Sequence, residues 1–230
     1  MSKLDFTAKD LAEEQRKEME KHQNFSQTNM AAHYDELCCN YDDIYLKVGF
    51  PDPKKCADFV NELNVSTNIA DATIFDMGCG TGLVGKYLVE LGFVNIHGVD
   101  ASGGMLKEAT GKNAYTLLEE LFLGSPSTFP SKFHSSYDFI TASGILADNH
   151  LDNSVFEEML LALKVGGIAI FTTRTEYLTL YGYGPYLKKL VDEGKWKMVK
   201  NEAHFKYDKI EEAVGRFAKT EVQVFAYQKL

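Results

Sequence analysis

The sequence contains no apolar run long enough to cross a membrane and no internal repeat. A membrane-spanning helix needs about 20 consecutive apolar residues. The first 20 residues are too polar to act as a secretory signal peptide. These absences predict a protein of the cytoplasm that does not have a membrane as a partner.

Basic charge and cysteine are also scarce. The 230 residues include 24 Lys and Arg against 33 Asp and Glu, which gives a formal net charge of -9. Because phosphate binding needs a basic face, this balance argues against nucleic acid as a partner. The four cysteines have no C-x-x-C spacing, so we expect no metal site and a reducing compartment.

The most informative segment that is present covers residues 73–82, TIFDMGCGTG. A short apolar strand runs into an acid, Asp76, and then into three glycines at alternate positions. Such glycines let the backbone approach a ligand and direct free N–H groups at it. The next apolar run, residues 94–99, ends at Asp100, a carboxylate placed to bind a pair of ribose hydroxyls. The sequence therefore predicts a cofactor site at this turn.

Two motifs fit the turn, and they imply different cofactors. Residues 80–85, GTGLVG, match G-x-G-x-x-G, and Asp100 has the spacing expected for a nicotinamide dinucleotide site. However, a dinucleotide-binding strand ends at its first glycine, whereas here Gly78 breaks the chain two residues earlier. Residues 76–82 instead resemble motif I of the class I S-adenosylmethionine-dependent methyltransferases, D-x-G-C-G-T-G. An NAD-dependent oxidoreductase remains the alternative.

The resemblance to this methyltransferase family continues beyond motif I. Residues 100–109, DASGGMLKEA, are similar to the family pattern D-x-S-x-x-M-L-x-x-A. Residues 117–121, 137–144 and 163–170 resemble the third strand with its acid, the fourth strand, and the turn into the fifth strand. The resemblance implies S-adenosylmethionine as the cofactor and S-adenosylhomocysteine as the product. It also implies cofactor-binding roles for Tyr34, Tyr41, Asp76, Gly78, Cys79, Gly80, Gly82, Asp100, Ala101, Ser102, Met105, Glu120, Leu121 and Ser143.

The fold that the resemblance implies is α/β, a Rossmann-like seven-stranded, mostly parallel sheet with an antiparallel last strand and helices on both faces. Two β-rich runs, residues 196–207 and 216–227, fit the sixth and seventh strands of such a sheet. We predict an N-terminal helical lid segment over residues 1–50 and a methyltransferase domain over residues 51–230. Whether the first segment is a mobile lid or a permanently docked helix pair stays open.

Candidate acceptor residues follow the fourth and fifth strands, because ligands of open α/β sheets bind beyond the carboxyl ends of strands. We predict catalytic roles for His150 and Tyr34, since a histidine there can remove a proton from an acceptor. His150 is equally consistent with a loop or helix-start residue. Arg174, Tyr181 and Tyr183 are predicted to bind the substrate, because arginine and tyrosine recognise carboxylates and aromatic groups.

We therefore expect a methyltransferase that acts on a small-molecule acceptor by direct in-line transfer, as a monomer or homodimer. A catalytically silent cofactor-binding protein on the same fold is a third class, because binding does not establish turnover. The sequence does not identify the acceptor or the atom that is methylated.

Overall fold

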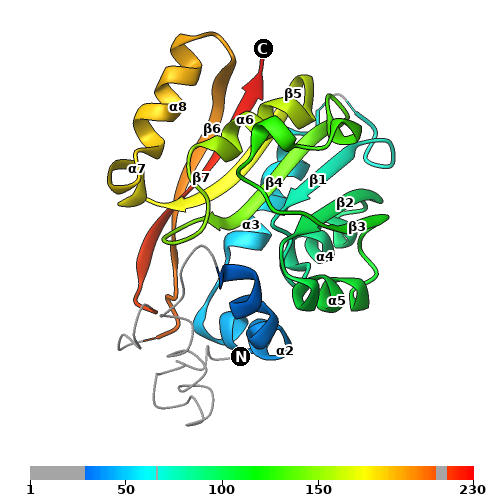
Figure 1. The fold of residues 1–230 in the computed structure, drawn as a ribbon, viewed down its shortest axis with the longest axis vertical. Helices are drawn as coiled ribbons and strands as arrows, with labels where there is room; N and C mark the ends of the chain where they lie inside the picture. Colours follow the sequence, from blue (N-terminus) through cyan, green and yellow to red (C-terminus); the bar gives the residue numbers. More distant parts are fainter. Residues whose placement is uncertain (1–28, 66, 211–216) are drawn as a thin grey trace.

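The computed structural model describes residues 29–65, 67–210 and 217–230, and shows a central sheet covered by helices (Figure 1). Residues 1–28 of the expected lid lie outside the described residues. The described helices are α2 (Met30–Val48), α3 (Asp52–Leu63), α4 (Leu83–Glu90), α5 (Gly103–Gly111), η3 (Pro126–Thr128), η4 (Ser131–Phe133), α6 (Ser154–Ala162), α7 (Tyr177–Leu180) and α8 (Tyr183–Asp192). The strands are β1 (Thr73–Met77), β2 (Asn95–Asp100), β3 (Leu117–Glu120), β4 (Tyr137–Leu146), β5 (Leu163–Arg174), β6 (Trp196–Lys206) and β7 (Thr220–Lys229).

The seven strands form one sheet in the order β3-β2-β1-β4-β5-β7-β6. The neighbours from β3 to β5 are parallel, whereas β7 runs antiparallel to both β5 and β6. Parallel neighbours need crossover connections, and the helices between successive strands provide them. The predicted Rossmann-like sheet with an antiparallel last strand is confirmed.

Each face of the sheet has its own apolar cluster, because successive strand residues point to opposite faces. On β5, Ile170 belongs to the cluster under α3 and α4, which also contains Phe59. Its neighbour Phe171 belongs to the cluster under α6 and α8, together with Phe156 and Leu190. This explains why β5 is a nearly continuous apolar run, as expected for a strand buried on both faces.

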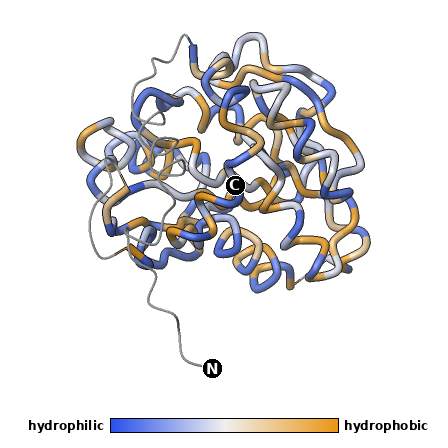
Figure 2. Tube along the Cα trace, turned by 90° about the horizontal axis from the view of Figure 1, so that it is seen from below, coloured by the Kyte–Doolittle hydropathy of each residue, from blue (hydrophilic) through white to orange (hydrophobic). Residues whose placement is uncertain are grey.

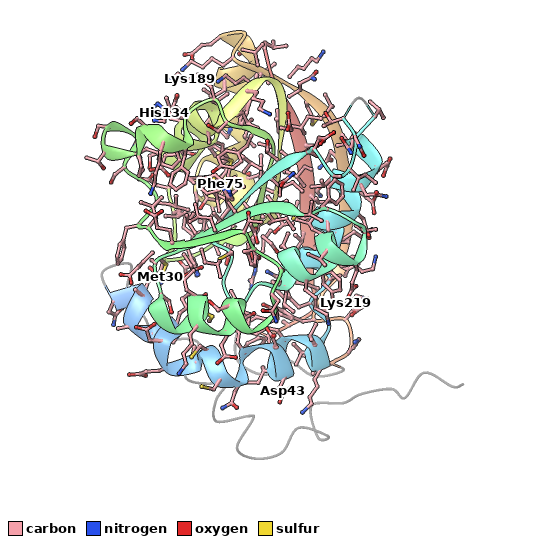
Figure 3. All side chains as sticks on the ribbon, turned by 90° about the vertical axis from the view of Figure 1, so that its right-hand side faces the viewer. Met30, Asp43, Phe75, His134, Lys189 and Lys219 are labelled. Atoms are coloured by element: carbon pink, nitrogen blue, oxygen red, sulfur yellow. The ribbon has the colours of Figure 1, made fainter. Side chains whose placement is uncertain are left out.

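Helix α2 lies against α5 beside the sheet, as the labels Met30 and Asp43 show in Figure 3. Its last turn buries Ile44 and Tyr45 in an apolar cluster with Tyr207 and Phe217. Residues before position 50 therefore share a core with the end of β6 and the approach to β7.

Apolar residues are spread along the chain rather than gathered in one segment. Figure 2 shows hydrophilic and hydrophobic residues alternating along the tube. None of the described helices combines the length and apolar character needed to cross a membrane.

Candidate active site

The turn after β1 has a backbone that requires glycine. Gly78, Gly80 and Gly82 have φ angles of 70°, 53° and 88°, a region that residues with a Cβ rarely adopt. A Cβ added at Gly78 would collide with Ile145, and one at Gly82 would lie 3.1 Å from Ala109. A Cβ at Gly80 would meet nothing within 4 Å, and Gly80 lines a cavity. Gly80 is thus the point of the turn that a ligand can approach closely.

Asp100 connects this turn to the end of β2. Its Oδ2 accepts a hydrogen bond from the Gly80 N–H at 2.8 Å, and its Oδ1 accepts one from the Ser102 N–H at 3.0 Å. Burial raises the pKa of Asp100 above its ordinary value, and these backbone N–H groups offset only part of that increase. A carboxylate has about four acceptor sites, so Asp100 can still accept hydrogen bonds from the cavity that it lines.

Asp76 supports the turn from beneath and does not line the cavity. It is fully buried, and it accepts hydrogen bonds from the Tyr115 hydroxyl and the Thr141 hydroxyl, both at 2.7 Å. The Tyr115 hydroxyl in turn accepts from the Gly85 N–H at 3.1 Å, at the start of α4. Burial raises the pKa of Asp76 to about 6. Asp76 therefore positions the strand end and the helix start around the glycine turn.

This pKa predicts how stability depends on pH. The native pKa of about 6 exceeds the ordinary value of 3.8, so the native protein binds more protons than the unfolded chain between these values. The stabilisation from protonated Asp76 is complete below pH 3.8, the ordinary pKa, and is lost as the pH rises through about 6, the pKa in the native protein. We expect this loss to be on the order of 3 kcal/mol.

Urea unfolding of the wild type and Asp76→Asn between pH 4 and 7 measures the effect. The free energy of unfolding of the wild type should fall relative to that of Asp76→Asn as the pH rises. A constant difference would show that Asp76 does not titrate in this range.

The cavity beside the turn lies where the carboxyl ends of β1, β2 and β4 meet α2, and it brings most of the expected site residues together. Residues from the expected set that line it are Tyr34, Tyr41, Gly78, Gly80, Asp100, Ala101, Met105, Leu121, Ser143 and His150. Of the expected cofactor-binding and catalytic residues, five do not line it: Asp76, Cys79, Gly82, Ser102 and Glu120.

Asp76 and Gly82 are described above, and the other three residues have the following surroundings. Cys79 is buried under the turn, where burial raises the pKa of its thiol. Ser102 caps α5, because its hydroxyl accepts a hydrogen bond from the Met105 N–H at 3.0 Å. Glu120 is exposed at the end of β3, opposite Asp100 in the strand register.

Two residues that the sequence separates by 116 positions meet at the cavity. The Tyr34 hydroxyl and His150 Nε2 are 2.8 Å apart, and His150 Nδ1 is 2.6 Å from the Asp148 carbonyl oxygen. Because the carbonyl can only accept, Nδ1 carries the proton in the neutral ring. Nε2 then accepts from the Tyr34 hydroxyl with its one lone pair, so an acceptor proton can reach Nε2 only through the Tyr34 oxygen, as the hydroxyl passes its own proton on.

Two acids on α2, each directly after one of the expected tyrosines, attach the helix to the start of α5 and to the glycine turn. Asp35 accepts hydrogen bonds from the Ser102 hydroxyl at 2.6 Å and from the Gly104 N–H at 2.8 Å. Asp42 accepts from the Thr81 hydroxyl at 2.5 Å and pairs with Lys112 at 2.7 Å. The spacing of seven that relates Tyr34 to Tyr41 also relates these two acids, so the four side chains belong to one sequence pattern on α2.

A second cavity adjoins the first, and it separates the three residues that were expected to bind the substrate. Arg174 lines it, whereas Tyr181 and Tyr183 do not. Tyr181 donates its hydroxyl to Asp148 at 2.6 Å at the protein surface. Tyr183 is only 1% exposed, and its hydroxyl donates to the Leu151 carbonyl at 2.7 Å. The Tyr183 side chain is thus part of the core and does not reach this cavity.

The sequence comparisons agree with this geometry. A model of the methyltransferase domain family matches residues 74–167. Methyltransferase-like protein 27 of Homo sapiens is 30% identical over 167 residues, which are 71% of this chain and 66% of that protein. The chain thus spans just under two thirds of this relative's length.

Solved structures share the fold. A magnesium protoporphyrin IX methyltransferase from Synechocystis with bound S-adenosylhomocysteine has a TM-score of 0.61 at 13% identity, covering 89% of this chain and 99% of that chain. An S-adenosylmethionine-dependent methyltransferase from Clostridium acetobutylicum has a TM-score of 0.58 at 17% identity, covering 85% and 98%. In its domain match, its relative and its fold, the chain resembles the class I S-adenosylmethionine-dependent methyltransferases.

The cofactor of such methyltransferases is S-adenosylmethionine, and the residues of the first cavity fit it. Gly80 leaves room for close approach, Asp100 offers carboxylate oxygens to hydroxyl donors, and Met105 and Leu121 provide apolar contact. The methyltransferase domain match over residues 74–167 includes the glycine turn, and it favours this interpretation over the NAD-dependent oxidoreductase.

Proposed function

We propose that the protein transfers the methyl group of S-adenosylmethionine to a small-molecule acceptor. The observation that carries this proposal is the Tyr34–His150 pair, which lines both the cavity beside the glycine turn and the second cavity next to it. A proton acceptor at the junction of two cavities is where a methyltransferase needs it when the nucleophile is a hydroxyl or an amine.

The cofactor-binding roles follow from position. We assign the ribose hydroxyls to Asp100, the adenine to Met105 and Leu121, and the amino-acid end to the glycine turn near Gly80 and Ser143. Bound S-adenosylmethionine supplies a sulfonium methyl group that is already electrophilic. The residues of the chain then have two tasks, which are to align the acceptor with that methyl group and to remove its proton.

The proton transfer can be written for a neutral acceptor. As the bond from the acceptor heteroatom to the methyl carbon forms and the sulfur–carbon bond breaks, the proton on the heteroatom moves to the Tyr34 oxygen while the Tyr34 hydroxyl proton moves to His150 Nε2. The Asp148 carbonyl keeps the other ring N–H oriented. Alignment in a closed site contributes about 7 to 11 kcal/mol in favourable cases.

Incubation with methyl-labelled S-adenosylmethionine and a deproteinised metabolite extract tests the function. We expect label in a small-molecule product that mass spectrometry can identify. If S-adenosylhomocysteine raises the unfolding temperature but no label leaves the cofactor, the protein is a silent cofactor-binding member of the family instead.

We also propose that α2 is a cover whose closure tightens with the cofactor. Asp35 attaches it to the first turn of α5 at Gly104, and Asp42 attaches it to the glycine turn at Thr81. A cofactor in the cavity beneath should stabilise the same two segments. We expect amide exchange in residues 29–48 to slow roughly tenfold on adding S-adenosylhomocysteine. Exchange in α8 serves as the control and should not change. Equal protection of α2 in both states would instead show a permanently docked helix.

All four cysteines are free thiols, including Cys38 and Cys39, whose sulfur atoms are 3.8 Å apart. Adjacent unpaired thiols are typical of a reducing compartment, which supports the proposal that the protein acts in the cytoplasm.

A further inference from the structure

The second cavity has a volume of about 340 Å³ and opens beside the cofactor cavity. This size is at the lower end of the range for small-molecule sites. The two cavities share Tyr34, Tyr41, Gly144 and His150. An occupant of the second cavity would therefore reach the His150 side chain at one end and would contact residues of the second cavity alone at the other.

Arg174, at the end of β5, provides a cation at the far end of this cavity. Its side chain is 16% exposed, and its guanidinium lies over the Tyr177 ring at 5.4 Å. Among the described residues, Arg174 forms an ion pair with Glu176 at 3.4 Å, and the Glu176 side chain is 60% exposed. An exposed carboxylate at this distance is a weak partner, so the guanidinium retains donors for an anion in the cavity.

Lys206, at the end of β6, places a second cation on the same wall. Its side chain is 10% exposed, and its ammonium lies over the rings of Phe50 and Tyr207 at 5.7 and 5.3 Å. It is 3.9 Å from Asp52, while His204 contacts that carboxylate more closely, at 2.8 Å. Among the described residues that line the cavity, the one acid is Asp148, which accepts a hydrogen bond from the Tyr181 hydroxyl.

Aromatic rings form the rest of the wall. The lining residues with aromatic rings, besides the Tyr34–His150 pair and Tyr41, are Tyr45, Phe50, Tyr177 and Tyr207. Rings arranged in this way bind flat apolar groups by stacking and edge contacts.

We propose that the acceptor is a small organic carboxylate with a flat apolar body, whose carboxylate is held by Arg174 beside the positive charge of Lys206, while a separate hydroxyl or amine faces the Tyr34–His150 pair. The inference rests on the proposed methyltransferase function and names its substrate class. The planar guanidinium matches a carboxylate in two parallel hydrogen bonds, which favours a carboxylate anchor. The carboxylate is the anchor, and the methyl group goes to the other polar atom.

Charge fractionation of the metabolite extract tests the proposal. The extract is separated at pH 7 by ion exchange into anionic, neutral and cationic pools, and each is incubated with methyl-labelled cofactor. Label should enter a product whose mass spectrum contains an unmodified carboxylate, from the anionic pool if the nucleophile is a hydroxyl and from the neutral pool if it is an amine. Transfer only to products without a carboxylate, or onto the carboxylate itself, or onto a phosphorylated product, would overturn the acceptor class and leave the methyltransferase function standing. Transfer with no pool would instead contradict the proposed function.

A variant then tests the anchor with the active pool. Arg174→Gln should raise the KM for the acceptor by about 10- to 100-fold, with a smaller change in kcat and no change in affinity for S-adenosylhomocysteine. Arg174→Lys should recover part of the loss. Lys189→Gln is the matched control, because Lys189 is an exposed cation on α8, far from Met30 in Figure 3. An unchanged KM in folded Arg174→Gln would rule out Arg174 as the anchor.

Discussion

Gly80→Val should bind S-adenosylhomocysteine at least about 100-fold more weakly than the wild type while remaining folded. The added side chain would have no protein atom within 4 Å of its Cβ, so it would project into the cavity that Gly80 lines. At φ 53° it would also add backbone strain of about 1 to 2 kcal/mol. Calorimetric titration with S-adenosylhomocysteine and thermal unfolding measure the two effects separately.

The chain contains a matched control for this substitution. Gly194 has a similar φ of 67°, and a Cβ there would also meet nothing within 4 Å, but it lies between α8 and β6. Gly194→Val should lower the unfolding temperature by a similar amount and retain full affinity. If both variants bind normally, the glycine turn is needed only for the backbone conformation. Asp100→Ala should weaken binding less than Gly80→Val, because it removes hydrogen bonds without adding an obstruction.

The second large effect is expected at His150. His150→Gln should lower the rate of methyl transfer by about 100- to 10,000-fold, the usual contribution of a general base, with little change in cofactor affinity. Tyr34→Phe should have a smaller effect, since it removes the hydrogen bond at 2.8 Å but leaves Nε2 in place. Single-turnover rates with the acceptor found in the extract provide the measurement.

His134→Gln is the control for this variant. His134 lies far from Met30 in Figure 3, and its ring stacks on Phe129. A folded His150→Gln protein with wild-type rates would mean that the acceptor loses its proton without help from the protein.

The fold and the cofactor turn were predictable because their signals are local. Residues 73–82 contain a strand, an acid and glycines within ten positions, and Asp100 follows the next strand. The contacts of α2 were not predictable in the same way. Asp35 meets Gly104 across 69 positions, and nothing near either residue indicates the other.

The acceptor residues show the same limit. Tyr181 and Tyr183 lie two positions apart in a glycine-containing segment, yet one hydroxyl is at the surface and the other is in the core. The direction of each side chain depends on how α7 and α8 pack on the sheet, which a local pattern does not encode. Lys206 and Tyr207 join Arg174 only because β6 and β5 end on the same side of the sheet, with β7 between them.

The order of the strands also bears on how the protein behaves at high concentration. The sheet ends at β3, which has only four residues, and at β6. An unpaired edge can add a strand from another molecule, which begins aggregation, and bulges and lysines oppose this. Strand β6 has a break in its pairing between Met198 and Lys200 and carries Lys197 on its exposed surface. Both edges thus discourage the addition of further strands. We therefore expect the protein to resist aggregation through edge-to-edge strand pairing.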